Sequence, residues 1–524
     1  MEQNVINFET EWTFAGETTI TVPVTGTVDA YIYYGDGTKE NITTANPTHT
    51  YQNAGKYIMK ISGKCDKFEY NTSTRDYLTG LKKWGCLQNI QYSFADDKNS
   101  CINLSGNIPQ VHEKSFVKII SFAQLFKNCS NLTGNIPEGM FNNCYNAIYL
   151  TSAFQGCKEI TGKIPQGIFD NCTKITNFAY LFYGCTGLTG SIPDGMFNDC
   201  QESKNFTYLF GGCSNLIGEV PENLFLNCPN TKNLNFVFSG CSNLNEIPSN
   251  LFNNINNGED NIVTSMMGMF NECRNIAEIP VGLFDKCPEV TAFGIWYQYG
   301  GLFKNCKKIT KIPSDLFKNC TKVKDMTQVF SGTSITEIPK GLLDNCTEIT
   351  KFGDEFYGGM FSNCPITEIP EGLFDNCVNA SNFASIFSGC HNLTIIPAGL
   401  FDNCTKVTNF TKSFFNCTNL IAIPDNLFDN CTEVTTFSAT FALCSSLISI
   451  PEALFDNCKK VDNFGANKID NISFASGGGT FAHCTSLTGK APELWNRSNV
   501  TSYYYCFRDC TGLENYDDIP DDWK

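Results

Sequence analysis

Apolar residues recur along this chain with a long period, not with the short periods of a single helix or strand. The phrase Phe-x-x-Cys returns at alternating intervals of about 13 and 15 residues, as in Phe169–Cys172 and Phe182–Cys185. Of the 28 cysteines, 24 close this phrase, and 23 of those have Phe three residues earlier. A fixed period over most of a chain indicates one supersecondary unit stacked on copies of itself.

Each repeat has two similar halves, and one half begins at an Ile-Pro or Val-Pro dipeptide. In a typical copy, the spacing of Leu393 and Ile396 suits a short strand that ends at Pro397, and Gly399–Cys404 suits a helical turn. We therefore predict a leucine-rich-repeat-type solenoid of about 14 coils of ~27–28 residues over residues 101–494, built from short strands plus helical or 3-10 turns.

The first ~70 residues follow a different pattern, in which β-branched and aromatic residues alternate with polar ones. They contain the turn Gly35-Asp36-Gly37-Thr38, followed by His49-Thr50-Tyr51 and Gly55-Lys56-Tyr57. These motifs resemble the PKD-type immunoglobulin-like β-sandwich. The resemblance implies an all-β domain over residues 1–70, with a junction and N-terminal cap at 71–100. Asp36 is interpreted as a turn-forming residue, with a metal ligand as the alternative.

The repeat Leu-x-x-Ile-Pro-x-x-Leu-Phe-x-Asn-Cys closely resembles the BspA-like leucine-rich-repeat surface proteins. A related form of that repeat is matched by Trp495–Thr501, followed by Phe507 and Cys510, so residues 495–524 are predicted to form a C-terminal cap repeat and acidic tail. An N-terminal PKD-like module is similar to this family's usual layout. The resemblance implies binding and adhesion, not catalysis.

Composition narrows the choice of partners and the role of the cysteines. The net charge of −16 argues against binding to nucleic acid or to an anionic membrane surface. No apolar run reaches the ~18 residues that a spanning helix needs. Because the cysteines follow the repeat register, we interpret them as reduced, buried ladders, with a disulfide framework or zinc as the alternatives. The Asn that often precedes Cys is interpreted as a residue that satisfies loop backbone groups, with glycosylation as the alternative.

No pattern of catalytic residues appears in the chain. The four histidines are His49, His112, His391 and His483, and none falls in a Ser-His-Asp order, an HExxH motif or a phosphate loop. We expect no enzyme activity, no cofactor and no metal site.

We expect the functional residues to lie where insertions interrupt the repeat. Insertions follow Phe293, Phe352 and Phe464, which occupy the same position of the repeat, so they should emerge on one face as a single lip. Exposed aromatic residues are typical of interaction hot spots. The binding residues predicted on this lip are Trp296, Tyr297, Tyr299, Asp354, Phe356, Tyr357, Lys468 and Phe474.

These observations predict a non-enzymatic recognition protein that binds a protein or glycan on a host or cell surface, attached to a larger assembly through its N-terminal domain. The sequence shows no leader and no anchor, and it is rich in Asn, Lys and Ile. We therefore expect a phage virion component, from a tail or a capsid decoration. The alternatives are a BspA-like bacterial cell-surface adhesin and an intracellular protein–protein interaction scaffold.

Overall fold

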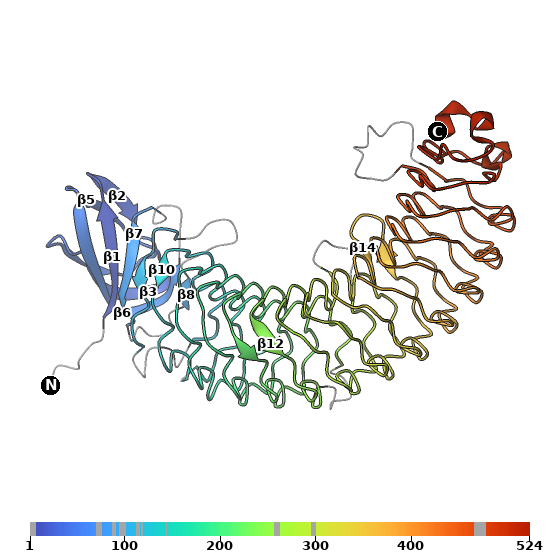
Figure 1. The fold of residues 1–524 in the computed structure, drawn as a ribbon. Coiled ribbons are helices and arrows are strands. Elements are labelled where there is room, and N and C mark those ends of the chain that lie inside the picture. Colours follow the sequence, from blue (N-terminus) through green and yellow to red (C-terminus); the bar gives the residue numbers. More distant parts are fainter. Residues whose placement is uncertain are drawn as a thin grey trace. The chain divides into compact units, whose positions relative to one another are not determined.

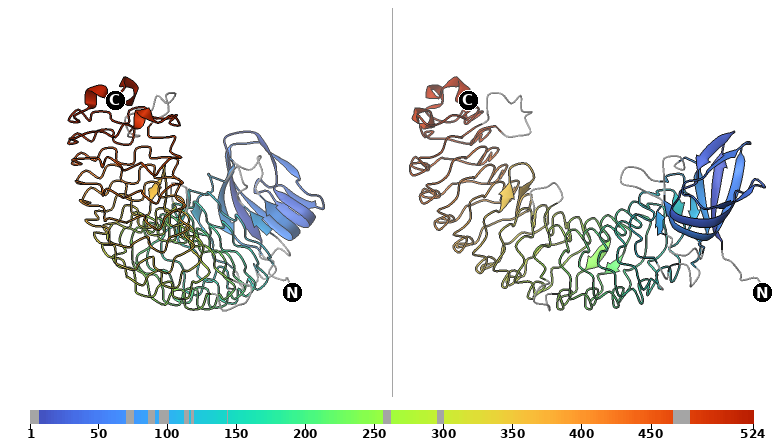
Figure 2. Two further views of the ribbon diagram at one scale, coloured as in Figure 1. Left: turned by 90° about the vertical axis from the view of Figure 1, so that its right-hand side faces the viewer. Right: turned by 180° about the vertical axis from the view of Figure 1, so that it is seen from behind.

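The computed structural model describes residues 7–69, 76–85, 91–93, 101–111, 116, 119–142, 144–255, 262–294, 300–465 and 478–524. The chain divides into two compact units, Met1–Ile262 and Val263–Lys524. The first unit holds the N-terminal sheets and the first stacked coils, and the second unit consists of further coils (Figures 1 and 2).

The N-terminal strands form two sheets with antiparallel pairing between consecutive neighbours. The larger sheet has the order β4(Lys39–Ile42), β3(Val24–Tyr33), β6(Gly55–Glu69), β1(Phe8–Phe14) and β7(Leu78–Lys83), and β8(Gln91–Ser93) pairs in parallel with β6. The smaller sheet pairs β2(Thr18–Thr21) with β5(Thr48–Tyr51). Side chains of β1 alternate strictly between buried and half-buried, as the sequence pattern predicted. Phe14 of β1 stacks on Tyr51 of β5 with ring centroids 4.3 Å apart, so the core draws on both sheets.

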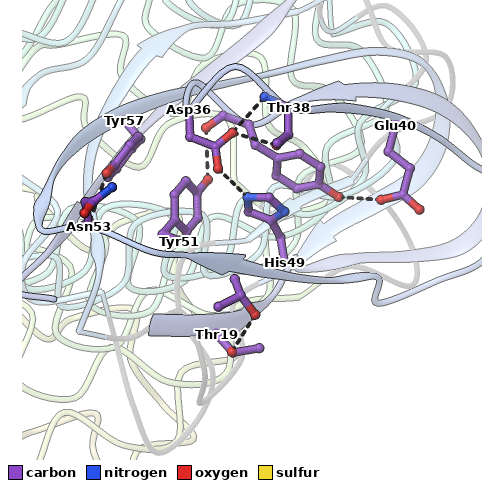
Figure 3. Close-up of polar contacts among 10 residues, drawn as sticks. Thr19, Asp36, Thr38, Glu40, His49, Tyr51, Asn53 and Tyr57 are labelled. Carbon is purple, nitrogen blue, oxygen red and sulfur yellow. Dashed lines mark hydrogen bonds and ion pairs between the residues drawn. The ribbon is translucent and has the colours of Figure 1, made fainter. Parts of the chain in front are cut away.

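The turn before β4 is held by the carboxylate of Asp36, which confirms its interpretation as a turn residue (Figure 3). Oδ1 accepts hydrogen bonds from the amide and the hydroxyl of Thr38, at 2.9 and 2.6 Å. Oδ2 lies 2.7 Å from Nε2 of His49, whose ring stacks on Tyr34. Burial alone would raise the pKa of Asp36, but the hydrogen bonds from Thr38 and the interaction with His49 outweigh it and lower this pKa.

The first coil continues directly from the larger sheet. Ser105 lies in a parallel bridge with Gly80 of β7, and its amide donates to the carbonyl of Thr79. Trp84 is buried, donates from Nε1 to the carbonyl of Pro109 at 3.0 Å, and packs edge-on against Phe116. The sheet and the coils of the first unit therefore share one continuous core.

Parallel bridges join each coil to the next, and we call the half-coil that carries them the bridge half. In the first unit five coils supply the residues Ser121, Tyr149, Asn177, Asn205 and Asn233. In the second unit nine coils supply Ser265, Ala292, Asp325, Lys351, Asn382, Asn409, Thr436, Asn463 and Ser502. These described coils agree with the predicted repeat number.

The other half-coil begins at the repeated proline, and we call it the proline half. A second series of parallel pairings runs just before the prolines. It includes β9(Gly106–Asn107) with β10(Leu132–Thr133), β11(Gly218–Glu219) with β12(Leu244–Glu246), and the bridge between Ile395 and Ala422. In the described coils the predicted short strands thus appear as single-residue bridges or as strands of two or three residues.

The predicted helical turns are wrong. Among the described residues, helical structure consists of three 3-10 helices near the C-terminus: η2(Leu494–Asn496), η3(Tyr516–Asp518) and η4(Asp521–Trp523). In the bridge half the amide of Cys185 does donate to the carbonyl of Phe182, which closes one turn. The backbone cannot continue as a helix, because Tyr180 and Gly184 have φ values of 58° and 72°. The amide of Phe182 donates to Leu209 of the next coil instead.

Phenylalanines and cysteines fill the interior in continuous columns. The rings of consecutive coils stack nearly parallel, as for Phe169–Phe197 with centroids 5.8 Å apart and Phe182–Phe210 with centroids 5.9 Å apart. All 27 cysteines in the described part of the chain are free and buried. The Asn residues before Cys serve as predicted where their bonds are described: the side-chain amides of Asn345 and Asn430 donate to carbonyls of the preceding coil.

The C-terminal residues close the last coil. The amide of Phe507 donates to the carbonyl of Trp523 at 2.8 Å, and the amide of Tyr505 donates to Asp522. Trp523 is buried and stacks on Tyr503 with ring centroids 4.9 Å apart. The tail thus pairs with the backbone edge that the repeat would otherwise leave open.

Candidate functional site

The three insertions share one register, as predicted. Ala292, Lys351 and Asn463 each lie in the bridge ladder of the second unit, and the insertions begin two residues after each of them. Asp354, Phe356 and Tyr357 are described in the structure. Trp296, Tyr297, Tyr299, Lys468 and Phe474 lie outside the described residues, so the single lip stays a prediction.

Each insertion is bracketed by two glycines that have no room for a side chain. A Cβ on Gly353 would lie 1.8 Å from the carbonyl oxygen of Ala384, and one on Gly359 would lie 2.4 Å from Cα of Ile386. The same crowding occurs at the equivalent glycines, which are Gly294 and Gly301 in one insertion and Gly465 and Gly479 in another. The backbone at both ends of each insertion therefore packs directly against the backbone of the next coil. We call each such pair a glycine bracket.

The middle insertion forms a short hairpin between its glycines. Strand β13(Gly353–Asp354) pairs antiparallel with β14(Gly358–Gly359), which is visible in Figure 1 beside the coils of the second unit. The carboxylate of Asp354 accepts a hydrogen bond from the amide of Phe356 and lies 3.6 Å from Nζ of Lys351. At the tip, 79% of Phe356 is exposed, more than any other large hydrophobic residue in the described part of the chain, and Tyr357 is 39% exposed.

Two side chains from other coils hold the tip of this hairpin in place. Nε2 of Gln328, one coil before, donates to the carbonyl of Tyr357 at 2.8 Å. Nζ of Lys412, two coils after, donates to the carbonyl of Glu355 at 3.2 Å. Burial lowers the pKa of Lys412, while the carboxylate of Glu355 partly opposes that shift. Nζ of Lys304 in turn donates to Oε1 of Gln328. The exposed Phe356 thus sits on a backbone that is fixed from both sides.

These supporting residues were not found from the sequence, because nothing in the repeat pattern marks them. Gln328 and Lys412 occupy the same repeat position as Ser385 and Ala439, and the backbone has positive φ at all four residues. Because the residue type at this position varies from coil to coil, as Ser385 and Ala439 show, the sequence alone gives no signal that identifies them.

A stack of aromatic side chains in the first unit, formed by two half-buried tyrosines and a buried phenylalanine, was also missed. Tyr180, Tyr208 and Phe236 occupy that positive-φ position in three consecutive coils. Their rings stack at 5.1 and 4.5 Å, and Tyr183 packs edge-on against Tyr208. Gly211 makes room for them, because a Cβ there would lie within 3 Å of both Tyr183 and Tyr208. The 28-residue spacing of these aromatic residues in the sequence could have revealed the stack.

Neither a metal centre nor a membrane span emerges from the residues that the structure describes. They contain no group of three or more His, Cys, Asp or Glu side chains placed to hold a metal ion. Nor do they contain a helix that is long and apolar enough to cross a membrane.

Comparison with solved structures finds leucine-rich-repeat proteins at low identity. The receptor kinase HAESA of Arabidopsis, solved with the peptide hormone IDA and the co-receptor SERK1, is 15% identical with a TM-score of 0.37, covering 82% of this chain and 65% of that one. Toll of Drosophila, solved with Spatzle, is 14% identical with a TM-score of 0.26, covering 78% and 53%. The functional domain of InlJ from Listeria monocytogenes, described as including a cysteine ladder, is 11% identical with a TM-score of 0.25, covering 79% and 70%. The chain thus spans about two thirds of HAESA and about half of Toll.

Sequence families give a more specific result. Residues 88–223 match a family described as a Mycoplasma protein of unknown function, DUF285. No curated protein sequence matches the chain. The BspA type leucine rich repeat region matches residues 162–308, 302–462 and 367–514, which together span more than half of the chain. With its stacked coils, paired half-repeats and Phe-x-x-Cys turns, this chain belongs to the BspA-type leucine-rich-repeat family.

Proposed function

We propose that this protein is a non-enzymatic recognition protein whose insertion face, in the second unit, binds a partner on a host or cell surface. Leucine-rich repeats of this type point to protein binding and recognition. The observation that carries the proposal for this face is Phe356, which is 79% exposed on a hairpin held by Gln328 and Lys412.

A phenylalanine in this setting has the properties of a binding anchor. Burying one such side chain in a partner contributes about 1.5–3 kcal/mol to the free energy of binding, relative to leaving it exposed to water. Because hydrogen bonds already fix the tip of the hairpin, binding would restrict few additional rotatable bonds. The entropic cost of ordering the hairpin on association would therefore be small. Nothing in the packing of the coil requires an apolar residue at this exposed tip, since Phe352 and Phe361 already fill the core on either side.

The shape of the anchor favours a protein over a glycan as the partner. Phe356 projects from a hairpin tip, so its ring is covered only if the partner surrounds it on several sides. A folded protein can offer such an apolar pocket. A glycan that lies along a surface would instead use polar groups around a flat ring, and Phe356 has no polar group to offer. The experiment below must therefore distinguish a glycan partner from a protein partner.

The wider context that we propose is a phage virion component, from a tail or capsid decoration, with the PKD-like N-terminal domain attaching the solenoid to a larger assembly. The GDGT turn and the antiparallel sheets of the N-terminal domain support that domain assignment. A BspA-like bacterial surface adhesin is the second candidate, favoured by the family itself. An intracellular scaffold is the third. Mass spectrometry of purified phage particles tests the first, and repeated absence of the chain from them would reject it.

Binding of the fluorescently labelled full chain to a panel of intact cells tests the proposed face. We expect Phe356→Ala to reduce binding at least ~10-fold, by loss of the buried ring. The matched control is Val281→Ala, because Val281 is 68% exposed on a proline half, away from the insertions. Proteinase treatment of the cells should abolish binding, and periodate oxidation of their glycans should not. Equal binding by wild type and Phe356→Ala would refute the anchor, and periodate-sensitive binding would identify a glycan partner.

A further inference from the structure

The cysteines of this chain are numerous and occupy equivalent buried positions, so the response of the protein to oxidants depends on whether these thiols are accessible. Each of the 27 in the described part of the chain is buried, and each measures 0% or 1% exposed. Cys86 lies outside the described residues. A disulfide exchange needs the attacking thiolate to reach a sulfur of the oxidant, so buried thiols cannot react until their coil opens.

The thiols are also engaged in the fold. In the bridge half, Sγ of Cys213 donates to the carbonyl of Phe182 in the preceding coil at 3.0 Å, and Sγ of Cys444 donates to Phe414 at 3.2 Å. Burial raises the pKa of both thiols to about 12, although hydrogen bonding to the backbone of the preceding cysteine partly opposes the shift. Folding therefore removes both the accessibility and the acidity that a reactive cysteine requires.

The unfolded chain has the opposite properties. Its 28 thiols are exposed, with pKa values near 8.5, and most neighbours along the chain are only about 13–15 residues apart. Short separations make loop closure easy, so many competing pairs can form. With glutathione disulfide, one protein thiolate attacks a glutathione sulfur and releases one glutathione. A second protein thiolate then attacks the mixed disulfide and releases the other glutathione. Two protein thiols have thereby given two electrons and two protons to the oxidant.

Disulfides formed in this way are incompatible with the solenoid. A disulfide between neighbours along the chain removes two thiols that donate to the preceding coil, as Cys213 and Cys228 do, and it ties a bridge half to a proline half although their cysteines stack in separate columns. We propose that the solenoid is a one-way redox lock: the chain must fold while its cysteines are reduced, and the folded chain then resists disulfide formation in an oxidising environment. A protein displayed on a surface would thus have to acquire its fold in a reducing compartment before release.

The experiment applies the same oxidant before and after folding. It uses the full-length Cys86→Ser variant so that only the 27 buried thiols are measured. Thiol reaction with an aromatic disulfide is followed in native buffer and in guanidinium. We expect native thiols to react at least ~1000-fold more slowly than denatured thiols, because a buried thiol can react only in the small fraction of molecules whose coil has opened. Wild type serves as the second protein, and its additional thiol, Cys86, is counted separately.

In the second arm, denatured protein is refolded with a reductant or with glutathione disulfide, and native protein is incubated with glutathione disulfide for the same time. We expect native circular dichroism and thermal unfolding in the first and third samples, and misfolded, cross-linked chains in the second. Refolding that succeeds equally with glutathione disulfide would overturn the proposal. So would native thiols that react within ~10-fold of the denatured rate. Neither result bears on whether Phe356 anchors a partner.

Discussion

The thiol of Cys185 donates a hydrogen bond to the carbonyl of Phe154 in the preceding coil, with Sγ and O 3.0 Å apart. The carbonyl of Phe154 also accepts the amide of Cys157 in its own coil. A carbonyl oxygen has two lone pairs, and the repeat uses both of them. The phrase Phe-x-x-Cys therefore specifies one closed turn, one buried ring and one donor to the coil before it.

The two half-coils use their cysteines differently. In the bridge half the described bonds from Sγ to Phe measure 3.0–3.2 Å, from Cys157 through Cys510. In the proline half they mostly measure 3.7–3.9 Å, as for Cys228 and Cys404, with Cys172 at 3.0 Å as an exception. The departures from Cys follow this division. Thr333 replaces Cys in a bridge half and keeps a donor, whereas Ile255 replaces it in a proline half and has none.

This difference predicts unequal costs for two matched substitutions. Cys213→Ala removes a short hydrogen bond and Cys228→Ala a long one, and both side chains are fully buried. We expect both variants to be destabilised by about 1–3 kcal/mol, with Cys213→Ala about 1 kcal/mol the worse. Urea unfolding measures both free energies. Equal losses would mean that the thiol acts by packing alone.

The glycine brackets predict a position that tolerates no side chain. Gly353→Ala places Cβ 1.8 Å from a backbone oxygen, which only movement of the next coil can relieve. We expect a loss of at least ~2 kcal/mol in the stability of the second unit, typical of overpacking. Gly16→Ala is the control, because nothing lies within 4 Å of its added Cβ. Both variants are compared by thermal unfolding, and equal midpoints would contradict the packing described at Gly353.

The support of the hairpin can be tested without any ligand. Lys412→Met removes the donor to the carbonyl of Glu355 while keeping the aliphatic part of the side chain. We expect amide hydrogen exchange over residues 353–359 to accelerate about fivefold or more, the effect of losing one hydrogen bond of about 1 kcal/mol. Lys406→Met, which removes a contact to Asn379 at an exposed site, should leave this segment unchanged. Unchanged exchange in Lys412→Met would show that Gln328 holds the tip alone.

The lowered pKa of Asp36 predicts an acid-sensitive N-terminal domain. Because the folded pKa lies below the unfolded value, the carboxylate stabilises the domain above about pH 4, and this stability is lost as the pH falls through the folded pKa. Asp36→Asn should cost ~1–2 kcal/mol at neutral pH and weaken the acid dependence, since the amide keeps an acceptor for Thr38 but carries no charge. Urea unfolding at pH 6 and at acidic pH, followed by near-ultraviolet circular dichroism, measures both effects. An unchanged acid dependence in Asp36→Asn would assign it to other carboxylates.

The architecture could be predicted because the sequence repeats with a regular period. The Phe-x-x-Cys phrase and the Ile-Pro dipeptides recur at fixed positions of the coils. The shared register of Phe293, Phe352 and Phe464 followed from the same period. The helical turns were mispredicted because local sequence does not show that the amide of Phe182 bonds to the next coil. The same reason hid the role of the thiols, which look like small apolar residues until their partners one coil away are seen.

The details of the site depended on contacts that no local pattern contains. Lys412 bonds to Glu355, which is 57 residues away in sequence, and the residues that flank Lys412 do not distinguish it from the same position in other coils. The aromatic residue of the insertion, Phe356, could be identified because it interrupts the period. The side chains that fix its position could not, because they lie in regular coils and differ from other copies only in residue type.

The most direct test of the account removes the middle insertion and leaves the coil intact. Replacing residues 353–359 with Ala-Ser, the residues found at 384–385 of the regular coil, should preserve thermal stability and circular dichroism. The account predicts that this variant and Phe356→Ala both lose at least ~10-fold in affinity for the proteinase-sensitive cell-surface partner, while Val281→Ala binds as wild type. Full binding by a folded chain without this insertion would contradict the claim that recognition resides where the repeat is interrupted.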